Sequence, residues 1–99
     1  MIENISAVII TKNAFETINT TLDSLIDFKE VVIFDSGSTD GTLDVIKTYG
    51  NVSLYSGDFL GFGEAKNHAI NLASNDWIFS LDADESLSKE LSLHLHEIE

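Results

Sequence analysis

Apolar residues in this chain gather in short runs that alternate with stretches of helical spacing. Residues 5–10 and 31–34 are nearly continuous apolar runs rich in valine and isoleucine, which is typical of strands covered on both faces. Residues 77–81 form a third run of this kind, and residues 51–55 form a shorter one that suits the edge of a sheet. These four runs predict four strands.

Between the runs, apolar side chains recur every three or four residues, which is the spacing of one helix face. Strands that alternate with such helices imply a parallel sheet with helices on its faces. The chain is therefore expected to form one open, mainly parallel, three-layer α/β domain over residues 1–99. The predicted helical stretches are residues 15–26, with Phe15 and Ile26 on the apolar face, and residues 43–49, 65–73 and 87–95.

The turns depend on glycine, serine, asparagine and aspartate, because the chain has no proline. Thr39 or Asp40 is the expected cap of the second helix. Residues 57–63 are rich in glycine and phenylalanine and predict a loop, with Phe59 and Phe62 anchored on the core.

The balance of acidic and basic residues limits which classes of molecule this chain could bind. Five Lys+Arg residues stand against 17 Asp+Glu, a formal net charge of −12, which argues against a nucleic-acid surface because that surface needs a basic footprint. The chain has no cysteine, so disulfides and thiolate metal sites are excluded. There is no long apolar run and no signal-like start, so we expect a cytoplasmic protein, with a peripheral position at the inner membrane open for a full-length form.

Polar residues follow three of the predicted strands directly, in segments 11–13, 35–38 and 82–85. Ligands of open parallel sheets bind beyond the carboxyl ends of the strands, where the strand order reverses. In a 3-2-1-4 order these three segments would meet at one edge. That edge would carry several carboxylates and almost no cation, so a bound metal ion is expected among them.

Asp82 and Asp84 are the sharpest feature of that edge. They follow a buried strand at positions i and i+2, where both carboxylates can reach one crevice. Oxygen ligands alone favour Mg²⁺ or Mn²⁺, which share their coordination with substrate phosphates. The alternative is that residues 82–85 only cap the last helix.

Two further residues could contact a ligand. Asp35 ends a very apolar strand, and its carboxylate can accept a hydrogen bond from a nucleotide base or a ribose hydroxyl. The alternative is a polar turn that caps the second helix. Lys66 follows the Gly61-x-Gly63 segment and could bring one cation to a phosphate, or it could be a surface lysine.

Four collinear segments carry a family resemblance: SAVIITKN (6–13), VVIFDSGSTDGT (31–42), GFGEAKNHAI (61–70) and DWIFSLDADES (76–86). Together they resemble the N-terminal half of a family 2 glycosyltransferase, closest to the branch that acts on lipopolysaccharide core and related cell-surface glycans. The resemblance implies the GT-A fold, a Rossmann-like sheet of order 3-2-1-4 that is truncated here before the acceptor half.

The resemblance also implies a donor site for a nucleotide-diphosphate sugar, with a UDP-sugar first, and Mg²⁺ or Mn²⁺ as cofactor. The acceptor of the full enzyme would be a glycan or a lipid-linked glycan. The implied roles are Thr11 and Asn13 at the nucleotide, Asp35 at base or ribose, Lys66 at a recurrent basic position, Asp82 near ribose and metal, and Asp84 as main metal ligand.

The resemblance departs from the family pattern at Ala14, where a glutamate commonly follows the Lys-Asn pair, and Glu16 comes two residues later. It implies inverting transfer, whose general base belongs to the second half of the domain. No catalytic residue is therefore expected within residues 1–99, and the isolated chain should bind donor weakly and transfer little.

Two alternatives remain open. Residues 77–86 also fit a haloacid-dehalogenase-like phosphatase, with Asp82 as nucleophile, Asp84 as acid/base and Mg²⁺ as cofactor. The other is a non-catalytic half-domain that binds a ligand or forms a homodimer through its uncovered sheet face.

Overall fold

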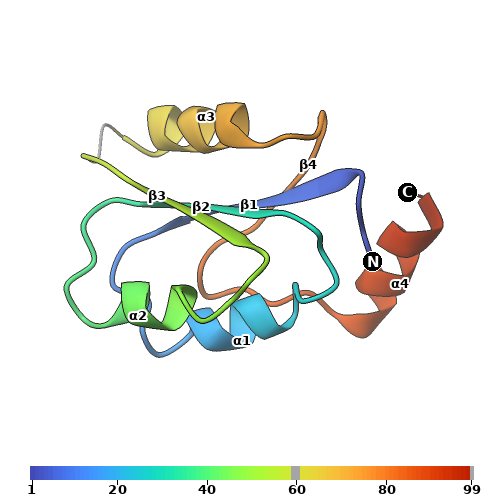
Figure 1. Cartoon of the computed structure of the whole chain (residues 1–99), viewed down its shortest axis with the longest axis horizontal. Coiled ribbons are helices and arrows are strands. Elements are labelled where there is room, and N and C mark those ends of the chain that lie inside the picture. The colour runs from blue at the N-terminus through green and yellow to red at the C-terminus, as the bar shows by residue number, and fades with distance from the viewer. Residues whose placement is uncertain (59–60, 99) are drawn as a thin grey trace.

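A computed structural model describes residues 1–58 and 61–98. Strands and helices alternate from the first element to the last (Figure 1). The elements are β1 (Ile5–Thr11), α1 (Ile18–Asp23), β2 (Val31–Asp35), α2 (Thr42–Ile46), β3 (Val52–Ser56), α3 (Phe62–Leu72), β4 (Trp77–Ser80) and α4 (Lys89–Ile98).

The strands form one four-stranded sheet in the order β3-β2-β1-β4, and every pairing is parallel. The register places Thr11 beside Asp35 and Asp35 beside Ser56, so β1, β2 and β3 end at the same level. Both the 3-2-1-4 order and the edge position of β3 are confirmed. The order reverses between β1 and β4, which is where a ligand is expected.

The sheet separates two apolar layers. Helices α1 and α2 cover one face, α3 covers the other, and α4 lies at the end of the molecule beside the N-terminus (Figure 1). The larger layer packs Ile9 and Ile33 of the sheet with Leu22 of α1 and other fully buried side chains. The smaller layer packs Val8, Val32 and Phe34 against Ala65 and Ala69 of α3.

The first helix is shorter than predicted. α1 has six residues, and Phe15 and Ile26 are 51% and 59% exposed, so their assignment to the apolar helix face is wrong. The backbone before α1 is held in a turn instead, because the Phe15 N–H donates to Asp40 Oδ2 at 3.2 Å. Helical spacing alone cannot reveal such a bond, since it forms between residues far apart in sequence.

The second helix begins at Thr42, with Gly41 as its N-cap in a left-handed conformation (φ 96°). Neither Thr39 nor Asp40 is therefore the cap residue. Asp40 still serves the helix start, because its Oδ1 accepts hydrogen bonds from the Thr42 N–H and the Thr42 hydroxyl. The hydrogen bond from that hydroxyl is the largest of several effects on the pKa of the Asp40 carboxyl group, and it lowers this pKa.

The predicted loop over residues 57–63 is only partly correct. Helix α3 already begins at Phe62, three residues before the predicted start, and Phe62 is 78% exposed rather than anchored on the core. Phe59 lies outside the described residues. In the part of the chain that the structure describes, no helix is long and apolar enough to span a bilayer.

Candidate nucleotide and metal site

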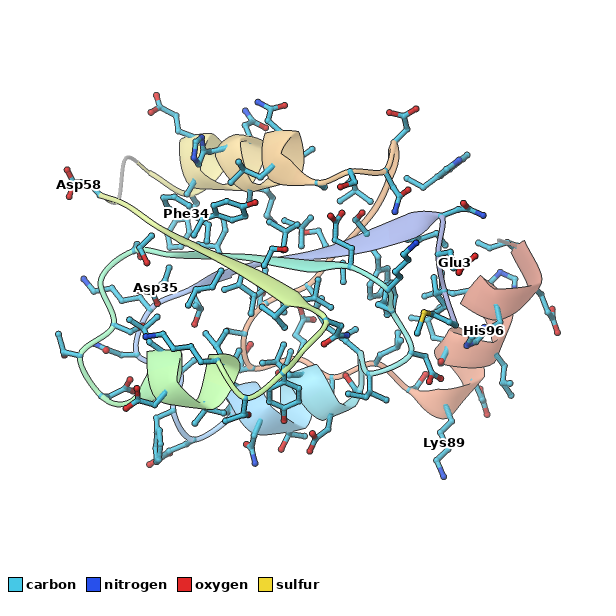
Figure 2. The ribbon with its side chains drawn as sticks, in the orientation of Figure 1. Glu3, Phe34, Asp35, Asp58, Lys89 and His96 are labelled. Atoms are coloured by element: carbon cyan, nitrogen blue, oxygen red, sulfur yellow. The ribbon has the colours of Figure 1, made fainter. Side chains whose placement is uncertain are left out.

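A cleft of about 620 Å³ opens at the carboxyl end of the sheet. The last two residues of β1 line it, together with residues that follow β1, β2 and β4 and with the first residue of α3. Figure 2 shows Asp35 at this end of the molecule and Lys89 and His96 at the opposite end. The lining residues are Ile10, Thr11, Lys12, Asn13, Ala14, Thr17, Ser36, Phe62, Asp82, Ala83 and Asp84.

Four of the six predicted site residues meet in this cleft: Thr11, Asn13, Asp82 and Asp84. Asp35 and Lys66 are outside its lining. Lys66 lies one helical turn after Phe62, so both residues share a side of α3. Contact of Asp35 or Lys66 with a ligand stays a prediction.

The loops after β1 and β2 form one wall of the cleft and are bonded to each other. The Asn13 N–H donates to Ser38 Oγ at 2.8 Å, and the Thr39 N–H donates to Asn13 Oδ1 at 2.7 Å. The Ala14 N–H donates to Thr42 Oγ1 at 2.9 Å. Asn13 itself has a φ of 53°, the left-handed region that asparagine tolerates better than most residues.

Asp35 is the buried anchor of the second loop, with 1% of its surface exposed. Its Oδ2 accepts from the Gly37 N–H at 2.9 Å and the Ser38 N–H at 2.8 Å, and its Oδ1 accepts from the Ser38 hydroxyl. The alternative of a polar turn is therefore correct in part, because the carboxylate organises its own loop. An ionised carboxylate has about four acceptor positions, so room for another donor remains.

The turn after β4 carries the two exposed carboxylates of the cleft. The Asp82 N–H donates to Glu85 Oε1 at 2.7 Å, and the Glu85 N–H donates to the Asp82 carbonyl at 3.0 Å. Helix α4 begins only at Lys89, so residues 82–85 do not cap it, and that alternative is wrong.

Two threonines at the start of α1 and within it hold this turn in place. The hydroxyls of Thr17 and Thr21 lie 2.9 and 3.0 Å from the Ala83 carbonyl oxygen. Ala83 stands between Asp82 and Asp84, so these contacts orient the residues on both sides of it. Sequence reasoning missed both threonines, although their spacing of four residues within the predicted helix over 15–26 was an available signal.

The carboxylates of Asp82 and Asp84 make no hydrogen bond or ion pair with any other residue that the structure describes. Both side chains are exposed and line the same cleft. Among residues 1–58 and 61–98, no group of three or more His, Asp or Glu side chains could hold a metal alone. Two carboxylates suit Mg²⁺ or Mn²⁺, since these ions keep waters and take substrate phosphates as further ligands.

Thr11 carries an unpaired group at the base of the cleft. The residue is 2% exposed, and its hydroxyl is the one buried side-chain N or O atom of the described chain without a hydrogen-bond partner. A buried hydroxyl without a partner costs about 1–3 kcal/mol. A bound ligand that reaches this hydroxyl would remove that cost.

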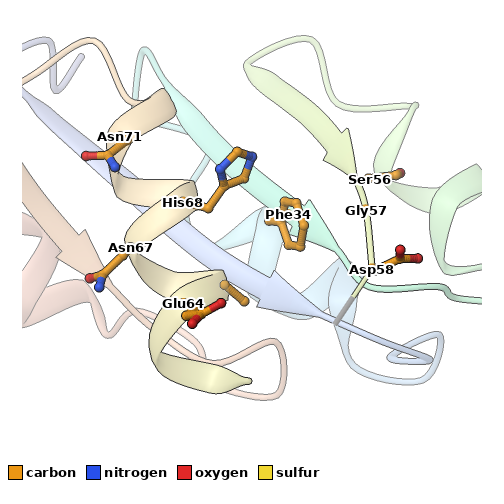
Figure 3. Close-up of a pocket in the computed structure, with 9 residues that line it drawn as sticks. Phe34, Ser56, Gly57, Asp58, Glu64, Asn67, His68 and Asn71 are labelled. Atoms are coloured by element: carbon orange, nitrogen blue, oxygen red, sulfur yellow. The ribbon is translucent and has the colours of Figure 1, made fainter. Parts of the chain in front are cut away.

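A second hollow of about 490 Å³ lies between the end of β3 and α3. Figure 3 shows His68 of α3 beside Phe34, with Ser56, Gly57 and Asp58 beyond it, and the His68 and Phe34 rings meet edge to face at 5.2 Å. Asp58 and Glu64 line this hollow and no lysine does, so a diphosphate would meet only negative charge. The 620 Å³ cleft, which Lys12 lines, suits a diphosphate better than this hollow does.

Solved structures share this fold and carry nucleotides. TarS of S. aureus, residues 1–349, superposes with a TM-score of 0.84 at 26% identity, over 95% of this chain and 31% of that fragment. The same protein is known in complex with UDP and with UDP-GlcNAc. Glucosyl-3-phosphoglycerate synthase of Mycobacterium tuberculosis, in complex with Mn²⁺, UDP and glucosyl-3-phosphoglycerate, superposes with a TM-score of 0.71 at 27% identity, over 84% of this chain and 35% of that protein.

Curated proteins and a family model agree with these structures. A glycosyltransferase of Rickettsia felis is 42% identical over 90 residues, which is 90% of this chain and 31% of that protein. The lipopolysaccharide core biosynthesis glycosyltransferase LpsC of Rhizobium meliloti is 35% identical over 99 residues, covering 95% of this chain and 36% of LpsC. The chain thus spans about a third of these relatives, and the glycosyl transferase family 2 model matches residues 6–98. The chain belongs to glycosyltransferase family 2.

Proposed function

We propose that this chain binds the nucleotide-diphosphate sugar of a glycosyltransferase, with a UDP-sugar as the first choice and Mg²⁺ or Mn²⁺ as cofactor. The observation that carries this proposal is the convergence of Thr11, Asn13, Asp82 and Asp84 on one cleft at the reversal of strand order. The UDP complexes of TarS and the Mn²⁺–UDP complex of the mycobacterial synthase support the choice of ligand.

Each residue has a separate role in this proposal. Asp84, with help from Asp82, would hold the metal ion, which neutralises charge on the leaving diphosphate. Thr11 and Asn13 would line the nucleotide, with Asp82 near the ribose. Asp35 and Lys66 are the residues that the family resemblance adds.

The reaction of the full-length enzyme would be inverting transfer to a hydroxyl of a cell-surface glycan or lipopolysaccharide acceptor. LpsC supports that acceptor class by its name. A general base must lie within hydrogen-bond reach of the acceptor hydroxyl. We assign that role to no residue in 1–99 and expect the isolated chain to transfer little sugar. We also propose a cytoplasmic location, peripheral to the inner membrane in the full-length protein. A homodimer through the truncated face of the domain belongs to the same proposal.

Isothermal calorimetry tests the binding step. UDP titrated into the 99-residue chain should bind weakly with Mn²⁺ or Mg²⁺ and much more weakly in EDTA. Equal binding with and without metal, or none at all, would contradict the proposal. The phosphatase alternative has no support from the comparisons, and hydrolysis of an aryl phosphate by this chain would revive it.

A further inference from the structure

The cleft wall is built from two loops that belong to different strand–helix units. One follows β1 and the other follows β2, and more than 20 residues of chain separate the partners in each bond. Four hydrogen bonds join them: the N–H groups of Asn13 and Phe15 donate to the second loop, the Ala14 N–H donates to Thr42 at the start of α2, and the Thr39 N–H donates to the first loop. We call these four bonds the loop clasp.

Ser38 occupies the centre of the loop clasp. Its hydroxyl donates to Asp35 Oδ1, and the same oxygen accepts from the Asn13 N–H at 2.8 Å. The hydroxyl has a single proton, so donation to Asp35 leaves the oxygen lone pairs free for Asn13. Ser38 therefore transmits the fixed position of a buried carboxylate to a residue that lines the cleft.

We infer that Ser38 is a positioning residue for nucleotide binding: it holds Asn13 and the loop after β1 in the shape that receives the nucleotide, without touching the ligand. Ser38 is outside the cleft lining, whereas Lys12, Asn13 and Ala14 are part of it. The expected effect of Ser38 on UDP affinity rests on the proposed function. Its expected effect on the conformation of the loop after β1 does not.

The conformation of Asn13 explains why the loop needs support. Its φ of 53° lies in the left-handed region, which asparagine tolerates better than most residues but still adopts less readily than ordinary backbone conformations. Asn13 is exposed, so packing in the core does not hold it there. Its backbone N–H and its side-chain oxygen are both bonded to the second loop, at Ser38 and Thr39. Loss of the Ser38 bond would let the loop relax, and the ligand would then have to order it on binding.

The test compares Ser38→Ala with Ser38→Thr, which keeps the hydroxyl, and with Ser53→Ala, a half-buried β3 serine for which no side-chain hydrogen bond is found in the described chain. Two readouts are needed: UDP affinity with Mn²⁺ by calorimetry, and amide hydrogen exchange of Asn13 by NMR. Amides of β1, such as that of Val8, report whether the sheet itself stays intact.

Ser38→Ala should weaken UDP binding roughly tenfold, which corresponds to about 1.4 kcal/mol. It should also speed exchange of the Asn13 amide while Val8 stays protected. Ser38→Thr should restore both readouts, and Ser53→Ala should change neither. Wild-type affinity in Ser38→Ala, or unchanged exchange at Asn13, would overturn the inference.

The two proposals fail in different ways. If the wild-type chain does not bind UDP, the proposed function is contradicted, and so is the effect of Ser38 on UDP affinity. Hydrogen exchange of the Asn13 amide then decides whether Ser38 holds the loop. If Ser38→Ala does not fold, Thr42→Val removes the neighbouring acceptor of the Ala14 N–H with little change in volume, and Thr42→Ser is its control. Faster exchange at Ala14 in Thr42→Val, with weaker UDP binding, supports the loop clasp; no change in either overturns it.

Discussion

The two ends of the sheet differ in how fully their polar side chains are paired. At the amino end, Glu30 accepts from the Ser6 hydroxyl at 2.6 Å and from the Ser74 N–H and hydroxyl at 2.7 Å each. Asn75 Nδ2 adds donations to Ser6 Oγ and the Glu3 carbonyl. Each of these side chains has at least one hydrogen-bond partner within the chain, as in a network that serves stability.

At the carboxyl end, the loop clasp and Asp35 are paired in the same way, but three side chains of the cleft have no partner in the described chain. The Thr11 hydroxyl is buried without a partner, and the carboxylates of Asp82 and Asp84 share a cleft with no paired cation in the described chain. Proteins commonly give up stability at functional sites and recover it elsewhere. The difference between the two ends therefore points to the carboxyl end as the functional one.

Asp84→Ala is the variant with the largest expected effect, and it tests whether the carboxyl end is the functional end. We expect it to weaken Mn²⁺-dependent UDP binding by at least about 100-fold, because it removes the proposed main metal ligand. The fold should stay intact, since the residue is exposed. Calorimetry and circular dichroism measure the two effects. Asp76→Ala removes an exposed carboxylate just before β4 and should bind UDP normally; equal loss in both variants would show only a general charge effect.

The next largest effect is expected at the opposite end. Glu30→Ala leaves three donors without their acceptor and should lower the free energy of unfolding by about 2 kcal/mol, a value reduced for the partial exposure of the carboxylate. Urea denaturation measures it, with Glu97→Ala on α4 as control. UDP affinity should not change, and a large change would contradict a purely structural role for this end.

Thr11→Val tests whether the unpaired hydroxyl at the carboxyl end lowers stability and serves ligand binding. Removal of an unpaired buried hydroxyl should raise the free energy of unfolding by about 1 kcal/mol, since the variant no longer buries an unsatisfied group. UDP binding should weaken a few-fold if the ligand uses that hydroxyl. A variant that is less stable and binds normally would show that the hydroxyl serves the fold.

The smallest expected effect is a dependence on pH at the amino end. Burial by itself raises the pKa of Glu30, but hydrogen bonds from Ser6 and Ser74 outweigh it and lower the pKa below 4.5. The carboxylate therefore contributes its stability fully above pH 4.5, and this contribution is lost as the pH falls through the lower folded pKa. Glu30→Gln should lose less stability than wild type on acidification, by under about 1 kcal/mol, as measured by urea denaturation at several pH values.

Much of the fold could be predicted because local patterns and chain connectivity act together. β-branched runs identify the strands, and a helix between each pair of strands requires a parallel sheet. The positions of Thr11, Asn13, Asp82 and Asp84 followed, because carboxyl ends of parallel strands share one edge. Phe15 and Phe62 were misjudged because large apolar residues were assumed to be buried, although such residues are often exposed at a protein surface.

The order of the amino acids was sufficient to determine the alternation of strands and helices and the side of the sheet on which the polar segments gather, since both depend on short-range periodicity and on connectivity. Tertiary structure alone decided which side chains are satisfied there. The bonds of Ser38 to Asp35 and Asn13, and the unpaired Thr11 hydroxyl, depend on distances of a few tenths of an ångström between separate loops. A hydrogen bond tolerates little error in distance or angle, so only the packed chain determines it.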